Sequence, residues 1–263
     1  MQRIPVRLTW TFTLLGAAAV TFSTAASAQE TATASTAWHV ALGGGIDVRP
    51  EFPGSDSTEL RLLPVVDISF ADRWFFNSAG LGAYVVRNEQ WLLSASIAPD
   101  LTRRDESAAA YLRGTGDIDR TAVAMLSGGY SLGPIKTTLA ISTDIANAGH
   151  GTVVDLAVQA RWNIAPRLSL DYGIAARWAN REYVETFFGV DAAQSERSGL
   201  SVYRADGGIS DARLFVNATY VLNPRWIISA GGAIAQLQGD ARDSPITADR
   251  DYAKVNAVIL YRF

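Results

Sequence analysis

Few side chains in this 263-residue sequence could carry out chemistry, since it has two histidines and no cysteine. The lack of cysteine excludes disulfide bonds and thiolate catalysis. A hydrolase would need a nucleophile, a histidine and an orienting polar group close together. Only His150, in the loop sequence ANAGHGT, has candidate hydroxyls nearby, at Ser142 and Thr143. No motif supports that arrangement, so we expect a solvated loop histidine. His39 is distant in sequence and no HxxxH spacing occurs, so no metal site is predicted from the histidines.

A group of carboxylates near the end of the chain is a second candidate for chemistry. It comprises Asp240, Asp243, Asp249 and Asp251, with Asp56 and Asp191 in other predicted outer loops. Carboxylates there could bind divalent cations shared with lipopolysaccharide. Because Arg242 and Arg250 are interleaved with them, solvated loop charge is the favoured interpretation. The sequence therefore predicts no metal and no other cofactor.

Charges of both signs also occur inside apolar segments. They are Lys136, Asp144, Asp155, Arg161, Asp171, Arg177, Arg213 and Lys254. If these segments form a barrel, the charges are candidates to line its lumen. The lumen would then be either a narrow aqueous pore with weak charge selectivity or a passage closed by paired charges. About twelve strands are compatible with both; we favour a constricted lumen.

The segments that carry these charges alternate in the manner of β-strands. In LSLDYGIAARWA (168–179), Leu, Tyr, Ile and Trp fall on one face, and Ser, Asp and Arg fall on the other. Strands are expected near 38–48, 91–102, 120–132, 135–145, 152–164, 168–183, 211–222, 226–239 and 251–263. Each is about ten residues long, as a tilted strand needs to be to cross a bilayer.

The connections between these strands alternate in length. GP (133–134), APR (165–167) and NPR (223–225) are tight turns, whereas 102–120, 186–208 and 239–251 are long and polar. This asymmetry is typical of outer-membrane barrels, with short periplasmic turns and long extracellular loops. Aromatic residues flank both ends: Trp91, Tyr130, Trp162, Tyr220, Trp226, Tyr261 and Phe263 beside the short turns, and Trp178, Tyr183 and Tyr252 at the far end. Such rows fit the two membrane interfaces; the alternative is the core of a soluble sandwich.

The stretch 59–86 decides the number of strands. One crossing gives ten strands and three crossings give about twelve. In a single crossing, the adjacent Asp72 and Arg73 would place one charge against lipid, at a cost of a few kcal/mol. We therefore predict a turn at these two residues, a short strand from Trp74 and a bend at GLG (80–82), with ten strands as the alternative.

The first residues resemble a processing signal. Arg3 and Arg7 precede an apolar run (8–21), and the small residues Ala26-Ser27-Ala28 form a cleavage pattern. We predict a secretory signal peptide at 1–28, a short periplasmic segment at 29–37 and a single barrel domain at 38–263; a retained membrane helix is the alternative. The formal charge of −3 argues against a nucleic acid partner.

Several pieces of the chain together resemble the MipA/OmpV family of outer-membrane proteins. They are the stretch 52–84, FFGVDAAQSERSGLSVYRADGGISD (187–211), GDARDSPI (239–246) and the final YRF. The resemblance implies a non-enzymatic barrel in the bacterial outer membrane, among lipid and lipopolysaccharide. It implies a scaffold that interacts with a lytic transglycosylase and murein synthase. Other members are described as adhesins or porin-like proteins, so these roles stay open, as does the oligomeric state.

The last segment, KVNAVILYRF, alternates to its end and is expected to close the barrel against the first strand. Tyr261 and Phe263 would lie in the periplasmic aromatic girdle. At the level of the family, we expect the barrel-assembly machinery to recognise such a strand ending in an aromatic residue.

Overall fold

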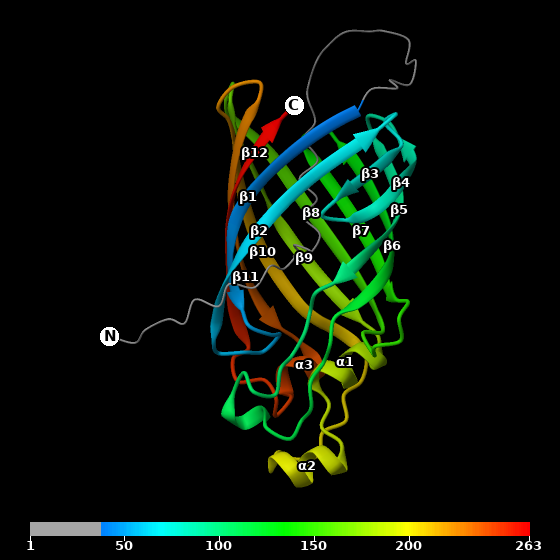
Figure 1. Cartoon of the computed structure of the whole chain (residues 1–263), viewed down its shortest axis with the longest axis vertical. Helices are drawn as coiled ribbons and strands as arrows, with labels where there is room; N and C mark the ends of the chain where they lie inside the picture. The colour runs from blue at the N-terminus through cyan, green and yellow to red at the C-terminus, as the bar shows by residue number, and fades with distance from the viewer. Residues whose placement is uncertain (1–37) are drawn as a thin grey trace, which may run out of the picture.

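Alternating residues build the wall of a closed antiparallel barrel in the computed structural model, which describes residues 38–263 (Figure 1). The strands are β1 (Trp38–Pro50), β2 (Thr58–Phe70), β3 (Trp74–Asn77), β4 (Gly80–Arg87), β5 (Trp91–Asp100), β6 (Thr121–Leu132), β7 (Ile135–Asp144), β8 (Thr152–Ala165), β9 (Leu168–Ala179), β10 (Gly208–Val221), β11 (Trp226–Leu237) and β12 (Asp251–Arg262). The predicted all-β barrel with twelve strands is confirmed. The predicted signal peptide (1–28) and periplasmic segment (29–37) lie outside the described residues.

Each strand pairs with its neighbours in sequence, and β12 pairs with β1 to complete the ring. That last pairing runs from Val48 opposite Val255 to Ala41 opposite Arg262. Side chains alternate across the wall as predicted: in β12, Val255 and Ile259 are exposed on the outside, whereas Leu260 is buried. The terminal segment therefore does close the barrel.

The stretch 59–86 contains three strands, β2, β3 and β4, as the count of twelve requires, but β3 has only four residues and turns back into β4 within the wall. The turn predicted at Asp72 and Arg73 is present, with Ala71 and Asp72 at positive φ and the Arg73 N–H donating to the Phe70 carbonyl at 3.1 Å. The next turn lies at residues 78–79, slightly before the predicted bend at 80–82. Gly80 follows it with φ of 93°, and a Cβ there would lie 2.2 Å from the Ile97 carbonyl oxygen, so only glycine fits.

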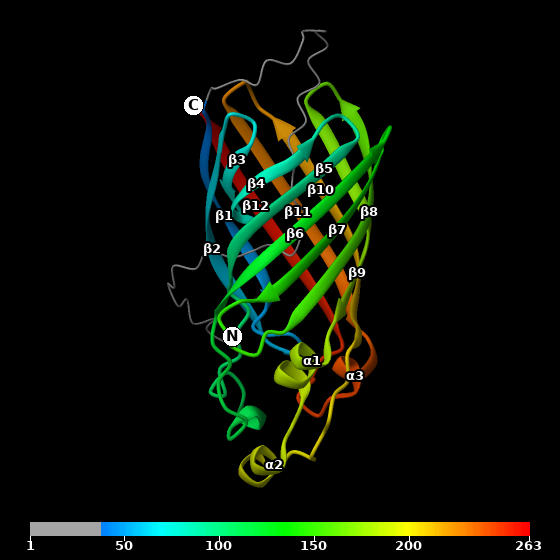
Figure 2. The ribbon, with the colours of Figure 1, turned by 90° about the vertical axis from the view of Figure 1, so that its right-hand side faces the viewer.

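The two ends of the barrel differ in their connections. At the short-turn end, two to four residues join the strands, and the C-terminus lies there (Figures 1 and 2). The opposite, long-loop end carries η1 (Ala110–Leu112), α1 (Arg181–Phe188), α2 (Ala192–Ser198) and α3 (Gly239–Asp243). None of the helices in residues 38–263 is long and apolar enough to cross a membrane.

The prediction of a strand over 168–183 was wrong at its C-terminal end. β9 ends at Ala179, and the Asn180 side chain accepts a hydrogen bond from the Tyr183 N–H at 3.1 Å. This N-cap satisfies a free donor of the first helical turn, so α1 starts at Arg181.

Two of the predicted interface aromatics were also assigned to the wrong surface. Trp91, Trp162 and Phe263 are exposed on the outside as expected. Tyr183, however, is buried in α1, and Tyr252 packs inward against the same apolar cluster. Tyr252 precedes the exposed Ala253 in β12, so strand alternation alone places it on the interior face.

The apolar core lies across the long-loop end of the barrel. Its buried residues are Ile118, Ala179, Tyr183, Val184, Phe187, Phe188, Ala205, Leu237 and Ala241. We call this cluster, with α1 and α3, the cap. A second cluster of Phe52, Leu112, Val190 and Ile246 joins the outer loops beside it. The cap therefore covers the interior at this end.

Candidate functional site

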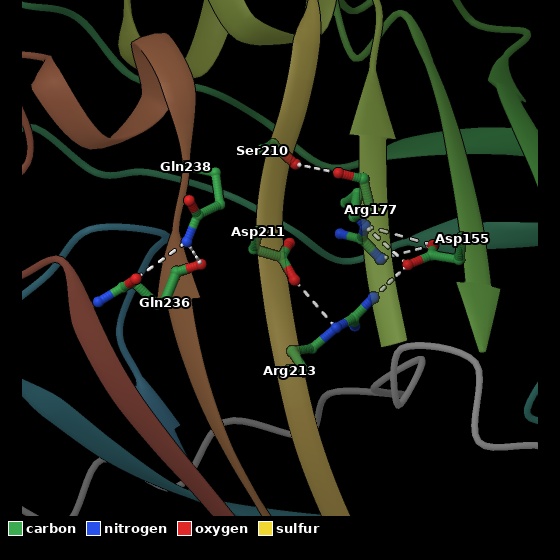
Figure 3. A network of polar contacts seen from close by, with 7 residues as sticks. All are labelled: Asp155, Arg177, Ser210, Asp211, Arg213, Gln236 and Gln238. Carbon is green, nitrogen blue, oxygen red and sulfur yellow. Dashed lines mark hydrogen bonds and ion pairs between the residues drawn. The ribbon is translucent and has the colours of Figure 1, made fainter. Parts of the chain in front are cut away.

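A network of charged side chains lies in the barrel interior beneath the cap (Figure 3). The carboxylate of Asp155 on β8 accepts hydrogen bonds from Arg177 on β9, with a shortest distance of 2.9 Å, and from Arg213 on β10. Strand register places Asp155 directly opposite Arg177. Arg213 also pairs with Asp211 at 2.9 Å, so two cations and two carboxylates neutralise one another.

A bulge interrupts β10 directly before Asp211. The register with β9 shifts between Ile209 and Asp211. As a result, Ser210 and Asp211 are both buried although they are consecutive, while Ile209 is exposed. Asp211 lies two residues before Arg213, so strand alternation places both on the inner face, and the bulge changes only the facing of the residues before Asp211.

A second ion pair lies closer to the short-turn end. Arg161 on β8 faces Asp171 on β9 in register, and the guanidinium donates two hydrogen bonds to the carboxylate at 2.8 and 2.9 Å. This bidentate geometry fixes both side chains. Lys136 on β7 is half-buried and interacts electrostatically with both partners. The candidates predicted from the sequence thus fall into two groups, except Asp144, which lies at the long-loop end of β7 and accepts a hydrogen bond from the Thr121 hydroxyl at 2.6 Å.

Lys254 on β12 joins the first group at a cavity directly below the cap. Its ammonium lies 5.3 Å from the centre of the Tyr252 ring. The cavity has a volume of about 90 Å³, and Lys254 and Arg177 both line it. Phe188 and Tyr183 of α1 are also part of its lining, so the cap borders this cavity.

A third cluster of charges, which was not predicted from the sequence, lies on β1 and β2. Register places Asp47 opposite Arg61, and Arg49 opposite Glu59. The Arg49 Nε lies 3.4 Å from Asp47 and 3.8 Å from Glu59, and Arg61 also pairs with Glu59. The signal was the spacing of two within each strand, DVR (47–49) and ELR (59–61), which puts both charges of a strand on one face.

His150 is buried, so the prediction of a solvated loop histidine was wrong. Its Nδ1 lies 2.9 Å from an Asp100 oxygen, and its Nε2 lies 2.8 Å from the Asp119 carbonyl. Both nitrogens face acceptors, an arrangement that the doubly protonated ring satisfies. Burial alone would lower the pKa of His150, but the hydrogen bond and charge of Asp100 raise it above its ordinary value.

The environment of His150 leaves it no role as a general base. A triad needs one ring nitrogen to receive a proton from the nucleophile, yet both are occupied. The Thr143 hydroxyl bonds instead with the Thr152 hydroxyl at 3.0 Å. His150 therefore ties three outer segments together, and its ring lies edge-on to Phe187 of the cap at 5.1 Å.

Arg104 performs a similar task for the loop between β5 and β6. Its Nη1 donates to the Phe187 carbonyl at 2.5 Å, which attaches this loop to α1. Burial lowers the pKa of the Arg104 guanidinium to about 10, so the group stays protonated at neutral pH.

The outer-loop carboxylates, for which solvated charge was favoured over cation binding, have separate partners in the structure. Asp240 accepts a hydrogen bond from the Asp206 N–H at 2.7 Å, and Asp243 lies 3.9 Å from Arg250. No three acidic or histidine side chains in the described residues are grouped so that they could hold a metal ion.

Tyr261 and Phe263 lie together at the short-turn end. Their ring centres are 4.9 Å apart, and Tyr261 is also 4.9 Å from Trp226. The Phe263 N–H donates to the Val40 carbonyl of β1 at 3.0 Å, so the closing seam continues to this residue.

Comparison with known proteins gives a family and several relatives. A family model described as "MltA-interacting protein MipA" matches residues 42–263. The "MltA-interacting protein" of Escherichia coli (strain K12) is 26% identical over 227 residues, which cover 84% of this chain and 89% of the relative. The "Putative outer membrane protein YiaT" of the same organism is 24% identical over 219 residues, covering 80% and 85%.

Solved outer-membrane channels also align with the barrel. The NanC porin in its rhombohedral crystal form is 9% identical, with 85% of this chain and 100% of that chain covered and a TM-score of 0.47. The outer membrane channel DcaP of Acinetobacter baumannii is 9% identical, with coverages of 86% and 96% and a TM-score of 0.39.

Proposed function

The chain belongs to the MltA-interacting protein MipA family, and we propose that it is a non-enzymatic outer-membrane scaffold that binds a lytic transglycosylase at its periplasmic rim. The family match over residues 42–263 is the observation that carries this proposal. A relative of similar length bears the name "MltA-interacting protein", and another is named as an outer-membrane protein. Through the transglycosylase, the barrel would be linked to murein synthase.

The rim proposed for docking is the short-turn end, because outer-membrane barrels keep short turns in the periplasm. Trp91 and Trp226 are exposed beside these turns, and Arg167 and Arg225 lie within them, also exposed. Aromatic and arginine side chains are enriched in protein interfaces. A stable interface buries about 800 Å² per partner, so the partner would have to contact several turns at once.

The interior supports a scaffold over a small-solute pore. The cap lies over the long-loop end, and beneath it Asp155, Arg177 and Arg213 pair with one another along the inner face of the adjacent strands β8, β9 and β10. A solute passing through would have to displace the cap. A planar-bilayer recording of the purified barrel tests this directly: the scaffold predicts no steady conductance, and a pore predicts regular single-channel steps.

Site-specific cross-linking tests the scaffold itself. A photoreactive amino acid at Arg225 in the periplasmic turn should cross-link to an added lytic transglycosylase of the MltA type. The matched control is the same group at Arg197 on α2, which is equally accessible but at the opposite end. Cross-links at both positions or at neither would contradict docking at the rim.

A further inference from the structure

The barrel wall is interrupted between β2 and β5. β2 pairs with β1 over its whole length, but with β3 only from Ile68 to Phe70. β5 pairs with β6 over its whole length, but with β4 only up to Ile97. Figure 1 shows that β3 and β4 occupy only the part of the wall near the short turns. Within the described residues, 58–67 of β2 and 98–100 of β5 therefore have no strand partner on their facing edges.

Both unpartnered edges contain a proline. Pro64 lies in the middle of the open stretch of β2, and Pro99 lies in that of β5. Proline has no N–H to donate, so within a sheet it belongs at edges. The two residues keep either edge from offering a complete ladder to another strand, which argues against a bound β-strand as the occupant of the gap.

A gap at membrane depth needs polar groups to fill it. Unpaired backbone groups are tolerated within a membrane only where they are covered by protein or border a polar, hydrated space. The cavity beneath the cap provides this space, because Arg61 of β2 and Leu101–Arg103, directly after β5, both line it. The two sides of the gap thus meet at one cavity.

The lining of this cavity carries more cations than carboxylates. It includes Arg49, Arg61, Arg103, Arg177 and Lys254 against Glu51 and Asp211, although Arg49, Arg61 and Arg177 also pair with Asp47, Glu59 and Asp155 outside the lining. Arg61 is only 6% exposed, and its Nη1 has no hydrogen-bond partner among the described residues. A buried guanidinium nitrogen without a hydrogen-bond partner favours the binding of an anionic ligand that can accept its hydrogen bonds.

The outer surface beside the gap is apolar. Leu60 and Leu62 of β2 face outward and are about half exposed, as are Leu81 of β4 and Ile97 of β5. The site thus combines an apolar outside with a cationic inside, which matches the two parts of an anionic lipid. One water needs about 10–15 Å³ of such cavity volume, so the cavity of about 90 Å³ has room for a phosphate group.

We propose that the gap between β2 and β5 is a lateral port, through which the phosphate head group of a membrane lipid enters the basic cavity while its acyl chains stay outside against Leu60, Leu62, Leu81 and Ile97. The port lies in the part of the wall toward the long loops, and hence opens to the outer leaflet. This site is separate from the periplasmic rim and does not depend on transglycosylase binding.

Lipid retention tests the port on the full barrel in phosphatidylcholine nanodiscs that contain dioleoyl phosphatidic acid. Native mass spectrometry after release should show bound phosphatidic acid in preference to dioleoylglycerol, which lacks the phosphate. Arg61→Gln should weaken retention about tenfold, the effect of losing a charge-assisted hydrogen bond. Arg120→Gln, an exposed change in the outer loop, is the matched control and should retain the lipid.

The other outcomes overturn the proposal. Equal loss in the two variants would mean general surface attraction. Displacement of the lipid by inorganic phosphate at equal concentration would mean a site for free anions rather than for a lipid. No preference for phosphatidic acid in the wild type would mean that the cavity does not bind the head group.

A second measurement does not depend on the folding of Arg61→Gln. A photoreactive amino acid at Val65, within the open stretch of β2, should cross-link to phosphatidic acid. The same group at Thr138, in the interior alternation of β7 where both neighbours are paired, should not. Absence of lipid cross-links at Val65 would rule out the port.

Discussion

The hydrogen-bonded ladder of the barrel wall is complete across β8–β10 and interrupted across β2–β5. Across β8, β9 and β10 the strands pair along nearly their whole lengths, and register sets Asp155 against Arg177 and Arg161 against Asp171. Across β2–β5 the ladder stops at a strand of four residues. Behind that interruption, Arg61 pairs with Glu59 through one nitrogen, while its Nη1 has no hydrogen-bond partner in the described part of the chain. In the complete region each interior cation is paired with a carboxylate, whereas in the interrupted region a guanidinium nitrogen stays available to a ligand.

The largest expected effect comes from breaking the complete region. Asp155→Asn removes the carboxylate that Arg177 and Arg213 share, and should destabilise the barrel by about 3–5 kcal/mol, because Arg177 loses its carboxylate partner and Arg213 keeps only Asp211. Urea unfolding of the refolded barrel in lipid vesicles measures this. The control Asp206→Asn breaks an exposed pair with Arg181 and should cost less than about 1 kcal/mol. Equal losses would show that the interior network does not hold the strands together.

A charge placed on the outer surface should cost different amounts of stability in the complete and the interrupted parts of the wall. Ile174→Arg puts a cation against lipid in the middle of β9 and should cost about 2–4 kcal/mol. Leu62→Arg makes the same change beside the gap, where the head of the side chain can reach a polar space, and should cost less. The same unfolding assay compares them; a greater loss for Leu62→Arg would contradict a polar opening there.

The contribution of His150, beside the cap, to the stability of the barrel should depend on pH. His150→Gln removes its hydrogen bonds to Asp100 and the Asp119 carbonyl and should cost about 1–3 kcal/mol in mildly acidic solution. Because the folded pKa of His150 is raised above 6.5, its stabilisation is complete below that pH and is lost as pH rises through the folded pKa. Unfolding curves of both proteins should therefore converge toward alkaline pH. A difference that grows with pH would mean that His150 is neutral when folded.

The smallest effect is expected at the prolines of the open edges. Pro64→Ala restores an N–H that has no strand partner to receive it, so stability should change by less than about 0.5 kcal/mol. The control Val158→Pro, in a strand paired on both sides, should cost about 3 kcal/mol or more. A clear gain in stability for Pro64→Ala would indicate that the edge of β2 is paired in the membrane.

The wall was predictable from the sequence to the extent that alternation and charge determine it. The adjacent charges Asp72 and Arg73 were sufficient to predict a turn there, three strands in 59–86 and hence twelve strands in all, although β3 and β4 are too short to be full crossings. The alternation of side chains along the strands likewise predicted that Asp171 and Arg177 point into the barrel. The first strand was predicted to end at residue 48, which separated Arg49 from Asp47 and hid the third charge cluster.

The cap was not predictable by the same means, since its contacts join segments distant in sequence. His150 is buried by Asp100, Asp119 and Phe187, which lie on other segments. The bulge that turns Ser210 inward has no pattern of its own in the sequence. The one local signal was Asn180, whose side chain caps α1 and which the strand prediction had included in β9.

Amide hydrogen exchange in lipid nanodiscs, resolved by residue, tests the contrast between the two regions most directly. We expect slow exchange along β9 and, in β2 between Leu60 and Val66, slow exchange only for amides that point toward β1. The amides of that stretch that point toward the gap should exchange much faster. Uniform protection of β2, equal to that of β9, would mean that the wall is closed and would contradict the lateral port.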